Sequence, residues 1–333
     1  GDWENPYLSL NKSFEADTVR ALGRIIANGH LEQGEKPVHF CMDCRSALAE
    51  AEVEYMDKKS HSIDVKFKVL PKSLESLCSS FQVNKTEEVY FVIWTTTPWT
   101  IPSNVAVCIH EDIEYVFTKG NSNHFIIAKD LLDECSDRWG FELEVLGSVL
   151  GKEIKDIVMA HPLYKRESRL LHGEHVTTES GTGCVHTAPA HGLDDYFICI
   201  KNGLESVKAL DNRGIFKEEY GPLSGLSTKK GDPIVIELLQ DNKALLAHQE
   251  YDHSYPHCWR HKTPLIFTST PQWFISMNKN NLIKGALNKV KNVNWEPSWG
   301  LQRIESMLTD RPDWCISRQR NWGVPITLAV HKE

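Results

Sequence analysis

Hydrophobic and polar positions recur along this chain with two periods, one typical of helices and one typical of strands. Apolar residues three and four positions apart predict a helix over residues 14–28 that ends at Gly29. Short apolar runs predict strands over residues 89–94, 104–109, 114–118, 125–128, 141–145 and 184–188. Further helices are predicted directly after residue 128 as far as Gly140, and over residues 194–202, 233–241 and 282–290. We therefore expect a mixed α/β fold, with a barrel or sheet that carries helices on its rim.

The helix over residues 233–241 has the clearest predicted start, because it opens with Gly231-Asp232-Pro233 and proline suits the first turn of a helix. From Tyr255 onward the sequence becomes rich in Trp, Arg and Pro. This change of character predicts a domain boundary near residue 250. The chain contains no internal repeat and no low-complexity tract.

Charge is spread unevenly over the 333 residues. The net charge is -8, but residues 251–333 carry 11 basic and 6 acidic side chains, so that this part stands at +5 and the rest at -13. The balance excludes a basic coat for nucleic acid over the whole molecule and leaves room for a local basic surface near the C-terminus.

The length of the apolar runs, the start of the sequence and the cysteine content indicate where in the cell the protein is expected. No apolar run approaches the roughly 18 residues of a membrane-spanning helix, and the start at Gly1 has no signal-peptide core, so we expect a piece of a longer protein with no membrane partner. Nine cysteines are an odd number and are mostly scattered. A secreted disulfide framework is therefore not expected, and a reducing, cytoplasmic location fits better.

Several common catalytic motifs are absent from the sequence. It contains no phosphate-binding P-loop, no dinucleotide-binding glycine fingerprint, no zinc-protease helix motif and no G-x-S-x-G nucleophile elbow. A hydrolase built on this chain would have to act without a serine elbow.

A threonine-rich segment, Trp94 to Asn104, is the first positive signal. A strand delivers three consecutive threonines and is then stopped by Pro98. Because side chains alternate along a strand, Thr95 and Thr97 should share one face while Thr96 takes the other. The hydroxyls and the Asn104 amide would then gather at one end of a sheet, where they could bind a ribose or an ester. Alternatively, threonine is present only as a good strand former.

The segment from Gly181 to Tyr196 is the second signal. Its glycines allow a tight turn, a short strand presents His186, and a loop leads to Asp194 and Asp195 at the start of a helix. An imidazole and a carboxylate could thus meet in one pocket. Alternatively, the aspartates only cap the helix and suit its dipole, and His186 is a satisfied core residue.

Two cysteine knuckles are the third signal. Cys41 and Cys44 form one C-x-x-C pair, and Cys258 and His261 form a similar pair 214 residues further on. Together they would make a tetrahedral zinc site of three cysteines and one histidine at the base of the region between them. The alternative is two separate reduced pairs.

Four segments together resemble bacterial-type isoleucyl-tRNA synthetases. They are the threonine-rich segment, the segment from Gly181 to Tyr196, the run from Tyr255 to Pro264, and the run from Asp313 to Gly323. The related leucyl and valyl enzymes usually have Thr-Thr-Arg-Pro in the threonine strand, so Thr97-Pro98-Trp99 favours the isoleucyl branch. The matching region of this family is connective peptide 1, the editing domain inserted into the class I catalytic domain.

The resemblance implies a fold and a division of the chain. It implies a β-barrel-like editing core decorated by helices, with flanking pieces of a class I synthetase catalytic domain. Residues 1–50 would form an entry segment with the first knuckle, residues 51–250 the editing domain, and residues 251–333 a return segment with the second knuckle. The knuckles would hold a structural zinc, editing itself would need no cofactor, and ATP would serve only the full-length enzyme.

The resemblance also implies a reaction, the hydrolysis of mischarged valyl-tRNA(Ile) to valine and tRNA. Its partners would be the acceptor end of tRNA(Ile), the valine moiety and the remainder of the parent synthetase in cis. Asp195 would hold the α-ammonium group. The residues Thr95, Thr96, Thr97 and Asn104 would line the adenosine and water side, and Trp94 and His186 would shape the pocket.

The two sequence signatures with which class I synthetases activate amino acids, H-[ILVM]-G-H and a K-M-S-K-S-like loop, are both absent from the chain. No aminoacylation is therefore expected from it. Two alternatives stay open at this point, an editing domain of a leucyl or valyl synthetase, and a tRNA-binding module that cuts no ester.

Overall fold

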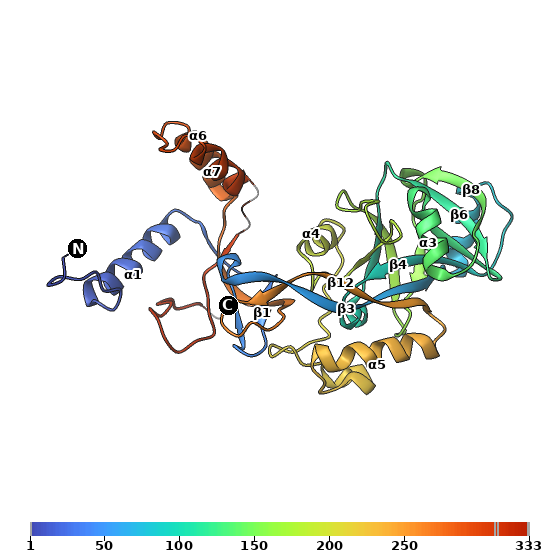
Figure 1. Ribbon diagram of the computed structural model, residues 1–333, viewed down its shortest axis with the longest axis horizontal. Coiled ribbons are helices and arrows are strands. Elements are labelled where there is room, and N and C mark those ends of the chain that lie inside the picture. The colour runs from blue at the N-terminus through green and yellow to red at the C-terminus, as the bar shows by residue number, and fades with distance from the viewer. Residues whose placement is uncertain (1, 310, 312, 332–333) are drawn as a thin grey trace.

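The computed structural model describes residues 2–309, 311 and 313–331 of the chain; residue 1 and residues 332–333, which the predicted entry and return segments include, lie outside this description. The molecule is elongated (Figure 1). Helices α1 (Lys12–Ala27), α6 (Leu282–Val290) and α7 (Gly300–Thr309) lie at one end, and a β-rich body that includes helix α3 (Leu132–Trp139) lies at the other.

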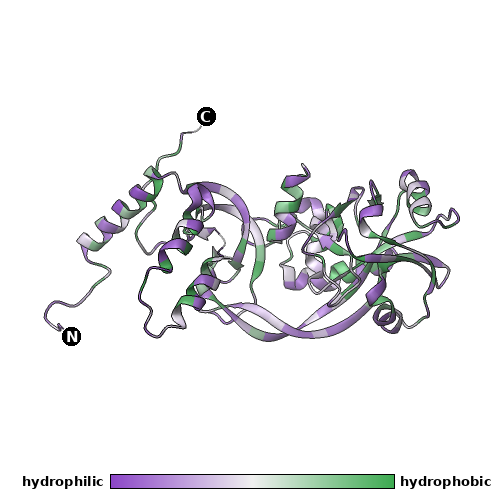
Figure 2. Cartoon of the chain, turned by 90° about the horizontal axis from the view of Figure 1, so that it is seen from above, coloured by the Kyte–Doolittle hydropathy of each residue, from purple (hydrophilic) through white to green (hydrophobic). Residues whose placement is uncertain are grey.

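A long two-stranded ribbon connects the two ends. Strand β3 (Val53–Lys68) pairs antiparallel with β12 (Leu245–Cys258), from Val53 opposite Cys258 to Val65 opposite Leu245. Much of the ribbon is exposed on both faces, and Figure 2 shows hydrophilic colours along much of it. This exposure removes the apolar alternation of a half-buried strand, which explains why neither strand was predicted. Residue 250, where a boundary is predicted, lies within β12.

The ribbon runs into a six-stranded sheet with the strand order β12-β3-β4-β7-β6-β8. Its other members are β4 (Val89–Thr95), β6 (Glu114–Gly120), β7 (Asn123–Ala128) and β8 (Glu144–Leu150). The inner part of this sheet is fully buried, and its largest enclosed side chains include Phe67, Phe91, Tyr115, Phe117 and Phe125. Continuous apolar runs were therefore good predictors here.

A second sheet of four strands packs on the same core in the order β11-β5-β10-β9. It consists of β5 (Ala106–Ile109), β9 (Val158–Ala160), β10 (Glu167–His172) and β11 (Val185–Thr187). A bridge between Val69 and Met159 joins it to the end of β3. The two sheets thus wrap around one interior, and the predicted mixed α/β fold with a barrel-like core and helices on its rim is confirmed.

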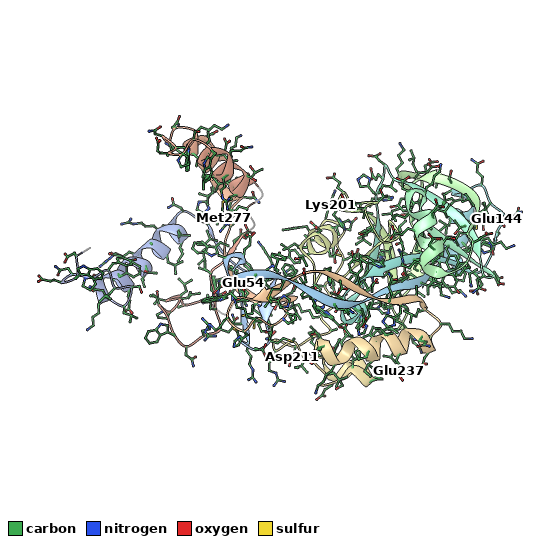
Figure 3. The ribbon with its side chains drawn as sticks, viewed as in Figure 1. Glu54, Glu144, Lys201, Asp211, Glu237 and Met277 are labelled. Atoms are coloured by element: carbon green, nitrogen blue, oxygen red, sulfur yellow. The ribbon has the colours of Figure 1, made fainter. Side chains whose placement is uncertain are left out.

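Three further helices decorate this body: α2 (Pro71–Ser80), α4 (Leu193–Lys201) and α5 (Thr228–Asp241). In Figure 3, Lys201 of α4 and Glu237 of α5 lie above and below the ribbon. The start predicted for α5 at Pro233 is wrong, because the helix begins five residues earlier and includes this proline. Gly231 allows the first turn to lie against Phe216, since a Cβ there would come within 2.5 Å of the ring.

The other end of the molecule is built on a third sheet, with the order β14-β13-β1-β2. Its strands are β1 (Leu31–Cys41), β2 (Ser46–Ala47), β13 (Ile266–Ile275) and β14 (Trp314–Cys315). Helices α1, α6 and α7 contain no buried residue. Short 3-10 helices complete the chain: η1 (Glu50–Glu52), η2 (Pro98–Ser103), η3 (Lys129–Leu131), η4 (Gly151–Glu153), η5 (Glu218–Leu223) and η6 (Lys279–Asn281).

Most predicted elements agree with the observed ones to within three residues. Helix α3 ends where predicted, with Gly140 in the left-handed region at φ 73°. The strand predicted at residues 141–145 is shifted, since β8 begins at Glu144. Within the described residues, no helix has both the length and the apolar content that a membrane span requires.

Candidate active site

The threonine-rich segment borders a cavity of about 240 Å³ at the end of β4. The hydroxyl oxygens of Thr95 and Thr97 lie 3.2 Å apart, so the prediction that these side chains share one side is confirmed. The prediction that Thr96 faces away is wrong, because β4 ends at Thr95 and the alternation of a strand ends with it. The cavity is lined by Trp94, Thr95, Thr96, Thr97, Thr100, Val185, His186, Ala188, His191 and Asp195.

His186 reaches this cavity from β11 and is held by two hydrogen bonds. The Asn104 amide nitrogen lies 2.8 Å from His186 Nδ1, and the Thr100 hydroxyl lies 3.0 Å from Nε2. Burial lowers the pKa of His186 to about 3. The imidazole is therefore neutral at physiological pH, so it contributes shape and hydrogen bonds and no charge.

Asn104 lies behind His186. It is fully buried and is not among the residues that line the cavity. The residue follows η2 and packs between β5 and β10, where its amide also donates to the Ala106 carbonyl at 2.7 Å. Asn104 can therefore act on the cavity only through the histidine.

Asp195 brings the single carboxylate into the cavity lining, from the first turn of α4. Its Oδ2 accepts a hydrogen bond of 2.9 Å from the backbone amide of Ala188. Burial, together with the nearby charge of Asp194 and against the Ala188 hydrogen bond, raises the pKa of Asp195 to about 6. Ionising this carboxylate costs free energy, and a cation placed beside it, such as an ammonium group, would reduce that cost.

Asp194 is exposed and has a different environment. The expectation that it caps the helix is wrong, because Gly192 is the N-cap residue and Asp194 lies inside the first turn. Gly192 also leaves room for the catalytic candidate, since a Cβ there would lie 2.8 Å from Asp195 Oδ2. The two aspartates thus have separate surroundings, a difference that the residue pattern left open.

His191, Thr100, Val185 and Ala188 also line the cavity, although the sequence did not single them out. His191 is enclosed, with Nε2 3.0 Å from the Ser103 hydroxyl and Nδ1 2.9 Å from the Phe267 carbonyl of β13. Burial lowers its pKa to about 4. The only signal in the sequence was its place in the His186 segment, and its contact with β13 depends on the tertiary fold.

Trp94 closes another side of the cavity. Its indole nitrogen donates to the Ser62 hydroxyl of β3 at 2.6 Å, and its ring meets the edge of Tyr251 from β12 at a centroid distance of 5.4 Å. Gly181 passes close to the indole, where a Cβ would lie 3.3 Å from Trp94 Cβ. Trp94 therefore joins the ribbon to the Gly181 turn beside the cavity.

The two cysteine knuckles meet at the base of the ribbon. The ligand atoms of Cys41, Cys44, Cys258 and His261 all lie within 4.8 Å of one another. The alternative of two separate pairs is therefore wrong: Cys41 ends β1, Cys258 ends β12, and the ribbon brings these ends together.

The spacing in this cluster can be compared with a metal site. The sulfurs of Cys44 and Cys258 lie 3.8 Å apart, and His261 Nδ1 lies 3.7 Å from Cys41 Sγ and 3.1 Å from Cys44 Sγ. Tetrahedral zinc, with bonds of about 2.3 Å to sulfur and about 2.0 Å to nitrogen, gives edges of roughly 3.5–3.8 Å. The separations of 3.7 and 3.8 Å match these edges, whereas that of 3.1 Å is shorter and the widest in the cluster lies within 4.8 Å; the donor set of three thiols and one imidazole is one that zinc prefers, so the four residues could hold such an ion.

The whole chain, residues 1–333, matches the family model of the tRNA synthetases class I (I, L, M and V). The chain belongs to this family. Among its relatives, the isoleucine–tRNA ligase of Colwellia psychrerythraea is 49% identical over 338 residues, and that of Shewanella amazonensis is 50% identical over 339 residues. The resemblance to bacterial isoleucyl-tRNA synthetases is thus confirmed. Each match covers 100% of this class I synthetase chain and 36% of the relative, so the chain spans about a third of their length.

Among solved structures, this synthetase chain is similar to GlLeuRS-CP1, with a TM-score of 0.47 and 17% identity, over 58% of this chain and 100% of that one. It is also similar to the P. knowlesi cytosolic leucyl-tRNA synthetase editing domain, with a TM-score of 0.45 and 14% identity, over 60% and 98% of the two chains. A likeness of this size carries no information about the site.

Proposed function

We propose that this chain is the post-transfer editing module of an isoleucyl-tRNA synthetase and hydrolyses valyl-tRNA(Ile) to valine and tRNA(Ile). The observation that carries the proposal is the Asp195 carboxylate, which shares one cavity with the hydroxyls of Thr95 and Thr97. The isoleucine–tRNA ligase relatives support the choice of tRNA. The need for editing is physical: one methylene in a pocket is worth only about 1–3 kcal/mol, and isoleucine against valine is the standard example of this limit.

Asp195 is the anchor for the substrate in this proposal. Its Oδ2 is already bound to the Ala188 amide, so Oδ1 remains available to accept hydrogen bonds from the α-ammonium group of valine. The charge of the ammonium offsets the cost of keeping a buried carboxylate ionised. The ester carbonyl then lies within reach of the threonine hydroxyls.

The proposed hydrolysis requires few catalytic groups from the protein. An aminoacyl ester is already activated, so the Thr95 and Thr97 hydroxyls need only orient a water molecule towards its carbonyl carbon. The water oxygen bonds to that carbon, and the bond between the carbonyl carbon and the ribose oxygen breaks. One proton of the water passes to the ribose oxygen, and the other is released to solvent as the carboxyl group of valine ionises. Neutral His186 and Trp94 bound the space for the side chain and adenosine. No covalent nucleophile is required.

The cysteine cluster has a structural role in this proposal. Cys41, Cys44, Cys258 and His261 would hold one zinc ion, which cross-links β1 to β12 and fixes the base of the ribbon. Editing itself would use no cofactor, and ATP would be bound only by the full-length enzyme. The acceptor end of tRNA(Ile) and the rest of the parent synthetase in cis are the partners, and the cytoplasm, where tRNA is charged, is the compartment.

The test is single-turnover deacylation by the purified chain. We expect release of valine from valyl-tRNA(Ile) well above the rate without protein, with isoleucyl-tRNA(Ile) as the matched control that stays intact. No isoleucine-dependent exchange of pyrophosphate with ATP is expected. Binding of tRNA(Ile) without release of valine would favour a non-hydrolytic binding module. Preferential cleavage of mischarged tRNA(Leu) or tRNA(Val) would instead assign the chain to a leucyl or valyl synthetase.

A further inference from the structure

A chain of hydrogen bonds runs from the interior of the second sheet to the threonine segment. It begins at Ser168 in β10, whose hydroxyl donates to the Asn104 carbonyl oxygen at 2.8 Å. The Asn104 amide donates to His186 Nδ1 at 2.8 Å, and His186 Nε2 lies 3.0 Å from the Thr100 hydroxyl. That hydroxyl donates to the Thr97 carbonyl at 2.8 Å.

The Asn104 amide determines the direction of every hydrogen bond in this network. The Asn104 amide nitrogen also donates to the Ala106 carbonyl at 2.7 Å, so both of its hydrogens are used and its oxygen must face Ser168. His186 Nδ1 must then accept, and the ring proton must sit on Nε2. Thr100 accepts that proton, which leaves its own hydrogen for the Thr97 carbonyl.

Ser168 and Asn104, the two members of this hydrogen-bond network outside the cavity lining, are shielded from water, whereas His186 and Thr100 border the cavity. Ser168 and Asn104 are fully buried, and His186 and Thr100 are also buried. Water therefore cannot replace a missing partner at low cost, since a buried polar group without a partner carries its full desolvation penalty. In addition, His186 stays neutral, so its tautomer is a fixed structural property in the working range of pH.

We infer that Ser168 is a positioning residue for the editing reaction: through Asn104 it fixes the tautomer and the ring orientation of His186, and thereby the shape of the pocket for the amino acid side chain. This inference rests on the proposed editing function. Ser168 has no place in the cavity lining, so it does not touch the substrate. Without its hydroxyl, the Asn104 oxygen loses its donor, and the Ala106 carbonyl is the only remaining partner, apart from the histidine itself, that holds the amide in this orientation. The imidazole then samples both tautomers and more than one orientation.

The test compares Ser168→Ala with Ser168→Thr, which restores a hydroxyl, and with Thr118→Val. The control removes an equally buried hydroxyl that donates to the Phe125 carbonyl, and neither residue lines the cavity. The first readout is the ¹⁵N spectrum of the histidine side chains, with His186 assigned from a His186→Asn variant. We expect one tautomer protonated on Nε2 in the unchanged protein, in Ser168→Thr and in the control, and a mixture in Ser168→Ala.

The second readout is hydrolysis under the same conditions. The loss of one neutral hydrogen bond corresponds to about fivefold in rate, so we expect Ser168→Ala to lower the kcat for valyl-tRNA(Ile) by about that factor with little change in KM. Its discrimination against isoleucyl-tRNA(Ile) should also fall. Thr118→Val should change neither.

The outcomes separate the two proposals. A single unchanged tautomer in Ser168→Ala, or the same kinetic change in the control, would overturn the role of Ser168. If no form of the protein hydrolyses valyl-tRNA(Ile), the editing function fails, and the ¹⁵N spectra still decide whether Ser168 fixes the imidazole. A folded Ser168→Thr protein with restored rate and tautomer would support the inference directly.

Discussion

Asp195 is half-buried and combines a defined hydrogen bond with an oxygen open to the cavity. The raised pKa means that keeping this carboxylate charged costs free energy in the folded protein. Proteins commonly accept such a cost where a charge is needed for binding. At the scale of one residue, function and stability therefore have opposite requirements at this position.

We predict that Asp195→Asn lowers valyl-tRNA(Ile) hydrolysis by about tenfold to more than a hundredfold. The amide keeps an oxygen for the Ala188 N–H but loses the charged hydrogen bond to the ammonium group, worth roughly 1.5–3 kcal/mol. The melting temperature should stay the same or rise, because a buried charge is removed. Asp194→Asn is the matched control, and its exposed side chain should matter little to hydrolysis. An equal loss of hydrolysis in both variants would contradict the assignment of Asp195 as the residue that binds the ammonium group.

The pH dependence of hydrolysis should follow Asp195. Its pKa is about 6 in the folded protein, and only the ionised form binds an ammonium group, so kcat/KM should rise as the pH increases from 5 to 7. The free energy of unfolding should depend on pH in the opposite direction. Because the pKa in the folded protein lies above the ordinary aspartate value of 3.8, the contribution of Asp195 to stability is present below pH 3.8 and is lost as the pH rises through 6. A pH profile of single-turnover rates tests this, and Asp195→Asn should lose the inflection.

At the scale of elements, a buried ion pair joins helix α3 to the ribbon. Arg138 binds both oxygens of Asp64 in β3, at 3.0 and 2.9 Å, and also donates to the Gly181 carbonyl at 2.7 Å. The side chains are 7% and 1% exposed, so solvent screens the pair very little. The guanidinium group of Arg138 thus fixes the Gly181 turn, which lies beside Trp94.

We predict that Arg138→Met lowers the free energy of unfolding by about 3–5 kcal/mol, because it leaves the Asp64 carboxylate buried without its partner. The double variant with Asp64→Leu should recover part of this loss, since no charge then remains in the interior. Arg20→Met is the control: its ion pair with Asp17 is 65% and 71% exposed, and it should change stability by less than about 1 kcal/mol. Urea unfolding measures all three, and equal small effects would contradict the prediction.

At the scale of the whole molecule, two connections hold the ends in a fixed relation. One is the cysteine cluster at the base of the ribbon. The other lies beside the cavity, where the Ser269 amide of β13 donates to the Ala190 carbonyl at 2.8 Å and His191 binds the Phe267 carbonyl. The candidate active site is therefore attached directly to the third sheet as well as through the ribbon.

We predict about one zinc ion per chain, measured by elemental analysis after purification under reducing conditions. Cys44→Ser should lower this content and the melting temperature, because a structural zinc ion contributes to the stability of the fold. Cys78→Ala, a buried cysteine outside the cluster, should keep the zinc. A stable protein that binds no zinc would disprove the assignment.

The sequence by itself determined the elements whose signals are local. Apolar runs identified β4, β6 and β7, Gly140 ended α3 because glycine takes the left-handed conformation without strain, and four motifs identified the family. The residue pattern also brought His186 and the two aspartates forward as candidates for one pocket, because turns and helix starts leave clear marks in the sequence, and the family resemblance singled out Asp195.

The tertiary structure alone decided everything that depends on two distant segments. Much of the ribbon is exposed on both faces, and its strands stabilise each other by pairing, so these parts carry no apolar pattern of their own. The cysteine pairs, 214 residues apart, meet only because that ribbon closes. Likewise, Asn104 was expected in the cavity from its place beside the threonines. Packing between β5 and β10 puts it behind His186, because its amide finds fixed partners there and a buried polar group must be paired.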